Sequence, residues 1–294
     1  MKFDFTGAGV ALITPFGEKN EIDFNALETI IERQIAGGID YLVALGTTAE
    51  TPTLSDEEKN EIVRFVREKT AGRIPVVVGM GGNDTLSMVK RISSSDFEGI
   101  SGLLTVTPYY NRPGQEGLYR HFKELADVSP VPLILYNVPS RTGVNLEAET
   151  VVRLAESSAN ITAIKEASGS IPQMSKIIRD TPSGFSVVSG DDVMALPLIA
   201  IGGKGVISVI ANALPDKLSL LIHSALAGDF QAAGILHRDL SELFRLQFQD
   251  GNPSGVKAML SHLGLIRNIL RLPLTPATPK TTGQIVSELS KIVS

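Results

Sequence analysis

One lysine of this chain stands where a nucleophile would be useful. The apolar, β-branched residues 161–164 are typical of a buried strand, and Lys165 follows at the carboxyl end of that run. Apolar surroundings remove water from an ammonium and favour the neutral amine, which can attack a carbonyl carbon. The position therefore indicates Schiff-base chemistry. The alternative is a strand-end lysine whose alkyl stem covers apolar surface while its ammonium reaches water.

Other reactive side chains follow other apolar segments. Thr47 and Thr48 lie in a tight turn whose hydroxyl and N–H groups could hold a small carboxylate, although such a loop could equally cap the next helix. Tyr136 ends another apolar run, and Arg141 follows it with a guanidinium able to grip a carboxylate. Tyr110 belongs to a pair of adjacent loop tyrosines, which more often serve packing or an interface. Together these groups suit imine chemistry on a small keto acid.

Metal and phosphate chemistry have little support in the sequence. Asp191 and Asp192 could touch a hard cation, but a pair of acids that opens a helix is more simply an N-terminal cap. No histidine has metal-ligand spacing, there is no cysteine, and no glycine-rich anion cradle follows the seventh or eighth apolar segment. All four histidines lie in segments of helical pattern: His121, His223, His237 and His262. We therefore expect neither a metal ion nor a cofactor.

The composition is that of an ordinary globular protein. The 294 residues are 43% hydrophobic and 20% charged, with a net charge of −5 and no cluster of basic residues. Nucleic acids and anionic membranes call for clustered Lys and Arg, so neither is expected as a partner. No apolar run approaches the ~20 residues that span a bilayer, and residues 1–7 lack the apolar core of a signal peptide. The lack of cysteine fits a cytoplasmic location.

The elements that must position these side chains follow one repeated unit. Short apolar segments alternate with amphipathic stretches of helical period, such as residues 24–35 and 57–66. The apolar segments lie at residues 10–13, 41–45, 76–78, 102–106, 133–136, 162–164, 185–188 and 205–208. Eight such units predict an α/β fold, a (β/α)8 TIM barrel, whose chemistry gathers at the carboxyl ends of its strands. An open doubly wound sheet is second, because no G-x-G-x-x-G turn follows the first segment.

The pattern becomes purely helical after residue 214. We expect residues 1–214 to form the catalytic barrel and residues 215–294 to form a C-terminal helical region packed on it. The expected helices cover residues 217–227, 230–248, 253–263 and 282–293, and the prolines of residues 272–279 predict an extended connector. Near the start of the chain, Asp23 is expected to cap one helix, while Ser55 and Glu58 form the capping box of the next.

Five motifs, taken in order, carry a family resemblance over essentially the whole chain. They are Gly-Thr-Thr-x-Glu at residues 46–50, Thr-Pro-Tyr-Tyr-Asn at 107–111, Tyr-Asn-Val-Pro-Ser-Arg-Thr-Gly at 136–143, Ile-Lys-Glu-Ala-Ser-Gly at 164–169 and Gly-Val-Ile-Ser at 205–208. The chain resembles the dihydrodipicolinate synthase family of the pyruvate-dependent class I aldolases. One departure is Ala49, where the family usually has glycine. We expect its methyl group to tighten the carboxylate loop slightly without abolishing activity.

The resemblance implies a reaction and its catalytic residues. Lys165 would form a Schiff base with pyruvate, and the enamine derived from it would add to the aldehyde of aspartate 4-semialdehyde. Tyr136 would shuttle protons, and because a phenol is a poor base at neutral pH it would need a relay through Thr47 to Tyr110. Tyr110 would come from a neighbouring subunit of a homotetramer built as a dimer of dimers.

The resemblance also implies the substrate contacts. Thr48 would share the pyruvate carboxylate with the preceding threonine, and backbone groups of Gly190 and Ile207 would line the same pocket. Arg141 would stand at the entrance and bind the carboxylate of the semialdehyde.

Two other interpretations stay open. A sialic acid lyase or a 2-keto-3-deoxy sugar acid aldolase would share the imine step with a different aldehyde. Arg141 discriminates between them, because a polyhydroxylated sugar calls for neutral hydrogen-bonding groups at that position. A catalytically silent barrel that acts as a binding protein is the alternative outside enzymes. The intact set Lys165, Tyr136 and Thr47 speaks against it.

Regulation by free lysine is also open to a prediction. The resemblance implies that lysine-inhibited members use an Asn, a Glu four residues later, and a histidine-bearing segment after the Gly-Thr-Thr loop. This chain has Asn83, but Ser87 stands in the place of the acid and residues 54–59 contain no histidine. Asp84 is expected to serve the start of the following helix instead. We therefore expect L-lysine to leave the enzyme essentially uninhibited.

Overall fold

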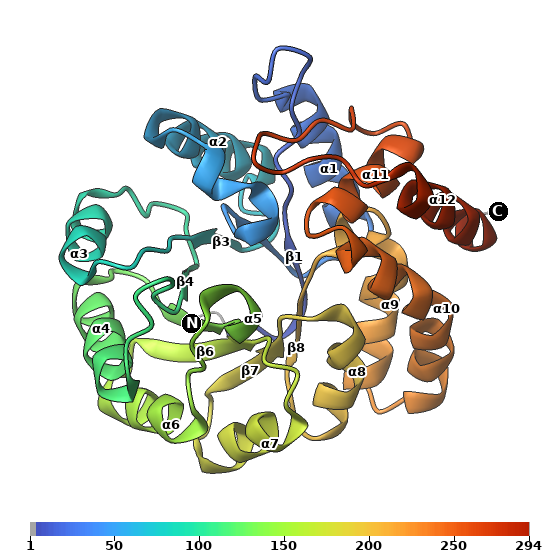
Figure 1. Cartoon of the computed structure of the whole chain (residues 1–294). Coiled ribbons are helices and arrows are strands. Elements are labelled where there is room, and N and C mark those ends of the chain that lie inside the picture. Colours follow the sequence, from blue (N-terminus) through green and yellow to red (C-terminus); the bar gives the residue numbers. More distant parts are fainter. Residues whose placement is uncertain (1–3, 294) are drawn as a thin grey trace.

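Eight parallel strands close into a barrel, each paired with the next in chain order and β8 paired with β1 (Figure 1). They belong to a computed structural model that describes residues 4–293. The strands are β1 (Gly7–Ala11), β2 (Tyr41–Ala44), β3 (Val76–Gly79), β4 (Gly102–Val106), β5 (Leu133–Asn137), β6 (Ile161–Glu166), β7 (Ser186–Ser189) and β8 (Gly205–Ser208). The predicted (β/α)8 barrel is confirmed, and the open sheet is excluded because this sheet has no edge strand.

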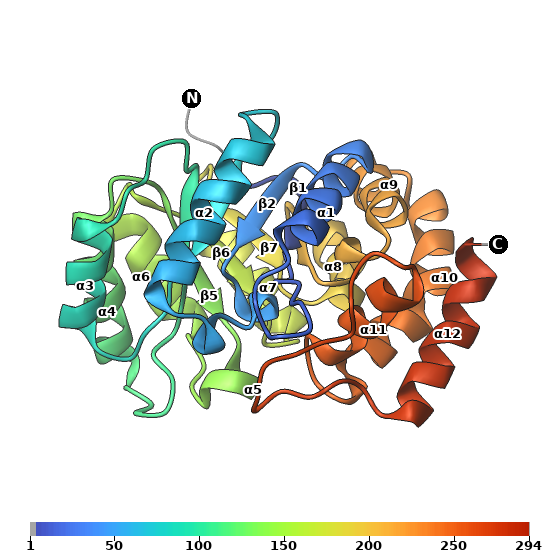
Figure 2. The same cartoon turned by 90° about the horizontal axis from the view of Figure 1, so that it is seen from above.

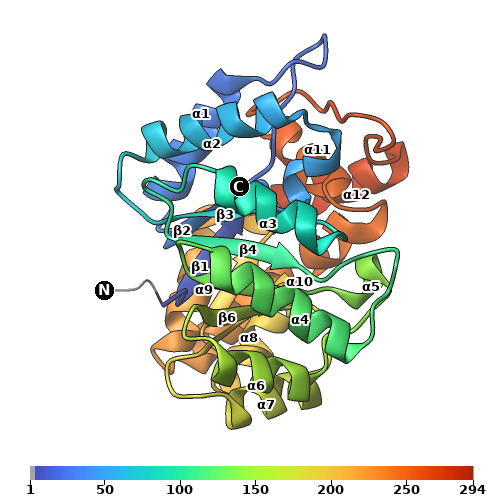
Figure 3. The same ribbon diagram turned by 90° about the vertical axis from the view of Figure 1, so that its left-hand side faces the viewer.

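Helices surround the strands in Figure 1, with the main helix of each unit between consecutive strands. They are α1 (Phe24–Ala36), α2 (Asp56–Thr70), α3 (Thr85–Ser94), α4 (Gln115–Val128), α6 (Ala148–Ser157), α7 (Ile171–Asp180), α8 (Asp192–Ala200) and α9 (Pro215–Leu226). A short helix, α5 (Pro139–Thr142), directly follows β5. Figures 2 and 3 show α5 at the end of the barrel toward which the strands point, so this end is the expected site of chemistry.

The helix starts follow the predicted capping chemistry. The carboxylate of Asp23 accepts a hydrogen bond from the backbone N–H of Ala26 at 3.0 Å. Ser55 and Glu58 form a reciprocal capping box at the start of α2. These contacts satisfy backbone N–H groups that a helix cannot pair within itself, so both predicted caps are confirmed.

The interior of the barrel is filled by apolar side chains. The inward-facing cluster comprises Phe5, Ala11, Tyr41, Val43, Val77, Leu104, Ile134, Tyr136, Val138, Ala163, Val188 and Ile207. Side chains that alternate with them along the strands point outward and pack beneath the helices, for example Leu42, Leu135 and Val206. Strands buried on both faces read as continuous apolar runs, which is why they were visible in the sequence.

Strand β1 begins three residues earlier than predicted. The additional residues pair with β8 and so close the barrel. Gly7 pairs with Gly205, and a Cβ atom on Gly205 would lie 2.0 Å from the carbonyl oxygen of Gly7. Gly205 also has a φ of +144°, which L side chains rarely adopt. The seam between β8 and β1 therefore depends on glycine. Glycines lack the apolar side chains by which a strand is usually recognised, so the pattern missed this part of β1.

The C-terminal region contains α10 (Phe230–Gln249), α11 (Ser254–His262) and α12 (Pro279–Val293), which pack against one another beside α8 and α9 (Figure 2). No helix or strand forms between α11 and α12, where the extended connector was predicted. Helix α9 packs on β1 and β8 and beside α1, so it is the eighth helix of the ring. The boundary expected at residue 214 therefore precedes the last helix of the barrel.

Helix α12 begins at Pro279, three residues before the predicted start. Proline is tolerated in the first turn of a helix, where its missing N–H would have had no partner. Within the described part of the chain, no helix is long and apolar enough to cross a membrane.

Candidate active site

Lys165 and Tyr136 lie side by side at the carboxyl ends of two neighbouring strands. They are register partners on β6 and β5, and the Nζ atom of Lys165 is 4.5 Å from the centre of the Tyr136 ring. Lys165 is 4% exposed and Tyr136 is 6% exposed. No carboxylate within residues 4–293 forms an ion pair with Lys165. The amine is therefore enclosed against an aromatic face, and the alternative of a lysine that reaches into water does not describe it.

Gly190 makes room for the stem of this lysine. A Cβ atom at Gly190 would lie 3.1 Å from Cε and 3.2 Å from Cγ of Lys165, and only 2.7 Å from Cβ of Ala167. The N–H of Gly190 donates to the carbonyl oxygen of Glu166 at 2.8 Å. Ile207 lies on β8 and belongs to the same inward-facing cluster as Tyr136. The structure thus gathers Gly190 beside Lys165, and places Ile207 on the inner wall of the barrel.

The turn after β2 is a pair of short 3-10 helices, η1 (Thr47–Ala49) and η2 (Thr51–Thr53). Thr47 is half-buried, and Thr48 is buried with its hydroxyl oxygen accepting a hydrogen bond from Nδ2 of Asn252 at 3.0 Å. Helix α2 is capped by Ser55 rather than by either threonine. The alternative of a loop that only caps the next helix is therefore wrong for these two hydroxyls.

A cavity of about 1200 Å³ opens at this end of the barrel. Its lining includes Thr47, Tyr109, Tyr136 and Arg141, and it continues outward over α2 and α3. Arg141 is exposed on α5, where its backbone N–H donates to the carbonyl oxygen of Val138 at 2.9 Å. The guanidinium thus stands at the rim of the cavity, while the phenol of Tyr136 stands deeper.

Tyr110 points away from the other predicted site residues. It is 89% exposed and has a φ of +73°, an uncommon conformation for a tyrosine. The loop is held by Nδ2 of Asn83, which donates to the carbonyl oxygen of Tyr109 at 3.1 Å, and by Nδ2 of Asn111, which donates to that of Asn83 at 2.9 Å. No hydrogen bond among residues 4–293 joins Tyr110 to Thr47 or Tyr136. The relay through these three residues stays a prediction.

Asp191 and Asp192 have structural partners. The carboxylate of Asp191 caps α8 by accepting from the N–H of Val193 at 3.4 Å, and burial together with the charge of Asp192 raises its pKa. Oδ2 of Asp192 accepts from the N–H groups of Val209 and Ile210 at 3.2 and 3.1 Å. The expected cap is thus Asp191 alone, while Asp192 holds the turn after β8. Within residues 4–293, no group of three or more His, Cys, Asp or Glu is placed to hold a metal ion.

A buried polar network behind the lysine escaped the sequence analysis. Glu166 and Asn137 directly follow Lys165 and Tyr136, and Nδ2 of Asn137 donates to both carboxylate oxygens of Glu166 at 3.2 and 3.1 Å. Gln173 donates to the same carboxylate at 3.0 Å. Both strand ends are thereby fixed on their outer side. The available signal was the alternation of a strand, which turns Glu166 and Asn137 away from the barrel interior.

Comparison with known proteins finds a family and relatives that match nearly the whole chain. The model of the Dihydrodipicolinate synthetase family matches residues 4–292. A 4-hydroxy-tetrahydrodipicolinate synthase of Parabacteroides distasonis is 50% identical over 286 residues, which cover 97% of this chain and 96% of the relative. The enzyme of that name from Azobacteroides pseudotrichonymphae is 53% identical over 283 residues, with 96% of each chain covered. The crystal structure of dihydrodipicolinate synthase from Thermotoga maritima superimposes with a TM-score of 0.96 at 39% identity, covering 98% of this chain and 99% of that one.

Proposed function

Since this chain belongs to the dihydrodipicolinate synthetase family, we propose that it condenses pyruvate with L-aspartate 4-semialdehyde to give 4-hydroxy-tetrahydrodipicolinate, a step of lysine and diaminopimelate biosynthesis. The chain is a lyase of the 4-hydroxy-tetrahydrodipicolinate synthase type. The observation that carries the proposal is the amine of Lys165, buried beside the phenol of Tyr136 at the mouth of the barrel.

The reaction begins with attack of the Lys165 amine on the keto carbon of pyruvate. Loss of water gives an imine whose positive nitrogen acidifies the adjacent methyl group, and removal of a methyl proton gives the enamine. The enamine carbon adds to the aldehyde carbon of the semialdehyde, and the aldehyde oxygen takes up a proton to become the hydroxyl group. The substrate's own amine then attacks the imine carbon, closes the ring and releases Lys165 with its original proton count.

Tyr136 is the group placed to move protons in this sequence. Its ring covers the amine, and its position at the cavity lets the phenol donate to and accept from the oxygen that leaves as water. A phenol needs a partner to return the proton at neutral pH. In our proposal Thr47, which lines the same cavity, is that partner, and Tyr110 of a neighbouring subunit completes the relay. The exposure of Tyr110 supports this arrangement, because its side chain is available to a second copy of the chain.

The two carboxylates of the substrates are assigned to different parts of the cavity. Thr47 and Thr48 bind the carboxylate of pyruvate through hydroxyl and N–H groups, and backbone groups of Gly190 and Ile207 line the same pocket. The amide of Asn252 donates to the oxygen of Thr48, which leaves the single hydroxyl hydrogen of Thr48 free to point at the ligand. Arg141 binds the carboxylate of the semialdehyde at the rim.

The choice among aldehydes rests on Arg141. A sugar-acid aldolase would need neutral groups at the rim, whereas an exposed guanidinium suits a short charged substrate. A silent barrel is disfavoured by the enclosure of an unpaired amine, which a binding protein has no need to bury. We also propose a homotetramer in the cytoplasm, made of two tight dimers that exchange Tyr110.

The test is capture of the imine. Pyruvate with borohydride should add the mass of one reduced imine to the peptide that contains Lys165, and Lys165→Ala should abolish both the adduct and turnover. Lys204→Ala is a matched control, because this exposed lysine precedes β8 at the opposite end of the barrel. Turnover is then measured with pyruvate and, in turn, aspartate semialdehyde, N-acetylmannosamine and glyceraldehyde. An adduct on another lysine, or a preference for a sugar, would refute the proposal.

A further inference from the structure

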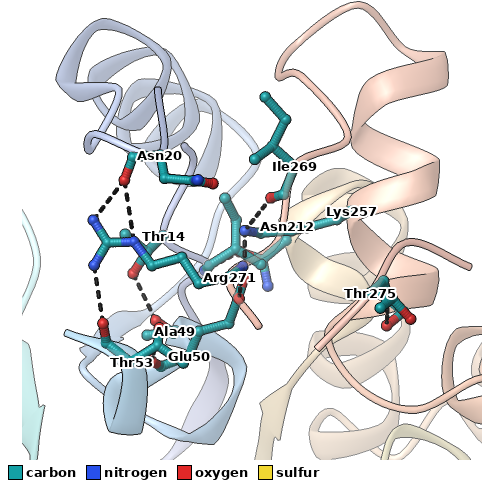
Figure 4. Close-up of polar contacts among 12 residues, drawn as sticks. Thr14, Asn20, Ala49, Glu50, Thr53, Asn212, Lys257, Ile269, Arg271 and Thr275 are labelled. Carbon is teal, nitrogen blue, oxygen red and sulfur yellow. Dashed lines mark hydrogen bonds and ion pairs between the residues drawn. The ribbon is translucent and has the colours of Figure 1, made fainter. Parts of the chain in front are cut away.

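A fully buried ion pair joins the turn after β2 to the C-terminal region. Glu50 follows the two threonines of that turn, and its carboxylate pairs with the ammonium of Lys257 on α11 (Figure 4). Both side chains are completely shielded from solvent. Nζ of Lys257 also donates to the carbonyl oxygen of Ile269 at 2.9 Å, and the other carboxylate oxygen of Glu50 accepts from the N–H of Arg271 at 3.0 Å. Neither charge of the pair is left without further hydrogen bonds.

The two residues before Glu50 are also held by distant parts of the chain. Asn252, which lies just before α11, donates to the hydroxyl oxygen of Thr48 at 3.0 Å. The hydroxyl of Thr14, after β1, donates to the carbonyl oxygen of Ala49 at 2.8 Å, as Figure 4 shows. Three successive residues of the turn, 48 to 50, are thus each fixed by a contact from a distant part of the chain.

Arg271 extends this hold to the far end of the turn. Its guanidinium donates to the carbonyl oxygen of Thr53 at 3.0 Å and makes two hydrogen bonds to the carboxylate of Glu58, at 2.7 and 2.6 Å. The same guanidinium lies over the ring of Phe16, and so does the ammonium of Lys257, with distances of 4.4 and 4.3 Å to the ring centre. The two cations therefore contact the same aromatic ring.

The backbone at Glu50 shows why the turn needs such support. Glu50 has φ 55° and ψ 34°, a left-handed conformation that a side chain other than glycine adopts only where its surroundings hold it. This residue lies between η1 and η2, so its dihedral angles set the angle at which the two short helices meet. Burial lowers the pKa of Lys257 to about 8 while the charge of Glu50 opposes the shift, so the ammonium is retained at neutral pH.

We infer that Lys257, Glu50 and Asn252 are positioning residues that orient the hydroxyl groups of Thr47 and Thr48 toward the pyruvate carboxylate. The inference rests on the proposed function, because it concerns the same carboxylate pocket. It makes the C-terminal region part of the substrate site, although neither Lys257 nor Asn252 contacts a reacting atom. A charge pair that only held two regions together could be replaced by apolar side chains without affecting substrate binding, since such side chains often fill the site of a buried ion pair equally well.

The experiment separates orientation of the turn from stability of the fold. Lys257→Met removes the ammonium, the double variant Glu50→Gln with Lys257→Met removes both charges, and Asn252→Ala removes only the contact to Thr48. Ser254→Ala is the matched control, because this buried residue of the same region donates to the carbonyl oxygen of Thr275 at 2.7 Å, and no hydrogen bond among the described residues joins its side chain to the turn. The measurements are the melting temperature, kcat, KM for each substrate, and the pyruvate concentration that gives half-maximal borohydride trapping.

We expect KM for pyruvate and the half-trapping concentration to rise about tenfold or more in Lys257→Met and in the double variant. Asn252→Ala should raise both several-fold, with KM for the semialdehyde changed far less. The double variant should melt at a higher temperature than Lys257→Met, because it does not leave a carboxylate buried alone, yet it should trap pyruvate as poorly. Ser254→Ala should lower the melting temperature and leave KM unchanged.

Unchanged half-trapping in Asn252→Ala and in the double variant would overturn the inference, whatever happens to their melting temperatures. If Lys257→Met fails to fold, these two variants still decide the question. A wild-type protein that traps no pyruvate would refute the proposed function itself. A wild type that traps, alongside variants that trap equally well, would refute only the role of these positioning residues.

Discussion

The side chain of Lys165 lies among an aromatic ring, a glycine and aliphatic groups. The ring of Tyr136 covers the end of this long, flexible side chain and Gly190 borders its stem, which leaves little space for other rotamers. In the mechanism proposed above, an amine confined in this way would meet the keto carbon repeatedly in the same geometry. The size of position 190 therefore matters as much as the chemistry of position 165.

Gly190→Ala tests this confinement. The added Cβ would lie 2.7 Å from Cβ of Ala167 and 3.1 Å from Cε of Lys165, so the lysine stem must shift. We expect kcat/KM to fall about a hundredfold and the melting temperature to fall as well, because a shift of the lysine stem does not relieve the contact with Cβ of Ala167. Steady-state kinetics and borohydride trapping check the result. Gly283→Ala in α12, where a Cβ meets nothing within 4 Å, should leave the kinetics unchanged; equal kinetics for both variants would contradict the prediction.

His121 on α4 gives a prediction about acid. Burial lowers its pKa to about 4, and Nδ1 contacts the hydroxyl of Thr85 at 2.9 Å. Because the unfolded chain binds this proton near pH 6.5, stability should be complete above that pH and fall as the pH drops toward 4. The loss at pH 5 is about 2 kcal/mol.

His121→Gln removes this titration and keeps a group for Thr85. Melting temperatures at pH 7 and pH 5 should therefore differ less in this variant than in the wild type. His262→Gln is the control, because His262 is exposed and its replacement should keep the wild-type difference. An undiminished acid sensitivity of His121→Gln would show that other groups cause it.

Residue identity alone singled out the candidate groups of the proposed site, but not the contacts that hold them. Lys165, Tyr136 and the two threonines stood out because polar groups at strand ends are hard to explain by packing. Lys257 did not stand out, since one lysine in an apolar helical stretch could as well lie on its exposed side. Its partner Glu50 is distant in sequence, and a single sequence contains no information on pairing of that range.

At the scale of elements, the sequence predicted the strands and helices that have a regular hydrophobic pattern. It missed the features that depend on closure of the barrel. The strands and helices were predicted in the right order because their sequence patterns differ. A strand buried on both faces is a continuous apolar run, whereas a helix buried on one face has apolar residues at helical spacing. The glycine seam at the start of β1 and the membership of α9 in the ring depend on how the sheet closes on itself. Neither has a local signal.

Asn212 is the element-level test of that closure. It ends η3 (Ile210–Asn212), and its amide accepts from the N–H of Ile13 at 3.0 Å and donates to the carbonyl oxygens of Ala11 and Val209 at 2.8 and 2.9 Å. Asn212→Leu leaves these buried groups unpaired, so the free energy of unfolding should fall by about 3 kcal/mol or more. Denaturant titration measures the loss. Asn25→Leu, on the exposed side of α1, should cost little, and similar losses in the two variants would contradict this role.

At the scale of the whole molecule, the groups near Asn83 bear on regulation. Asp84 caps α3 by accepting from the N–H of Leu86 at 3.2 Å, and it also accepts from the hydroxyl of Ser87, which lowers its pKa. Lys59 pairs with Asp56 at 2.9 Å. The expectation that Asp84 serves the helix start is confirmed. The carboxylates of Asp84 and Asp56 are thus engaged within the chain rather than directed at the ammonium of a free amino acid.

We therefore expect millimolar L-lysine to leave the initial rate essentially unchanged. An effector ammonium without a carboxylate partner would bind more weakly by roughly 2–5 kcal/mol than one that has such a partner. Initial-rate titration with L-lysine measures this directly, and Ser87→Glu, which supplies an acid at the fourth position after Asn83, is the variant expected to gain sensitivity. Half-inhibition of the wild type below about a millimolar would mean that another acid serves this role.

The contacts of Lys257 and Arg271 with Glu50 can form only after most of the chain has been synthesised. The ribosome completes all eight strands of the barrel and α9 before it reaches either cation. Until then, the nascent chain contains Glu50 without the partners that hold its turn. In the mechanism proposed above, the growing chain thus contains its imine-forming lysine before it contains the cations that hold the carboxylate pocket.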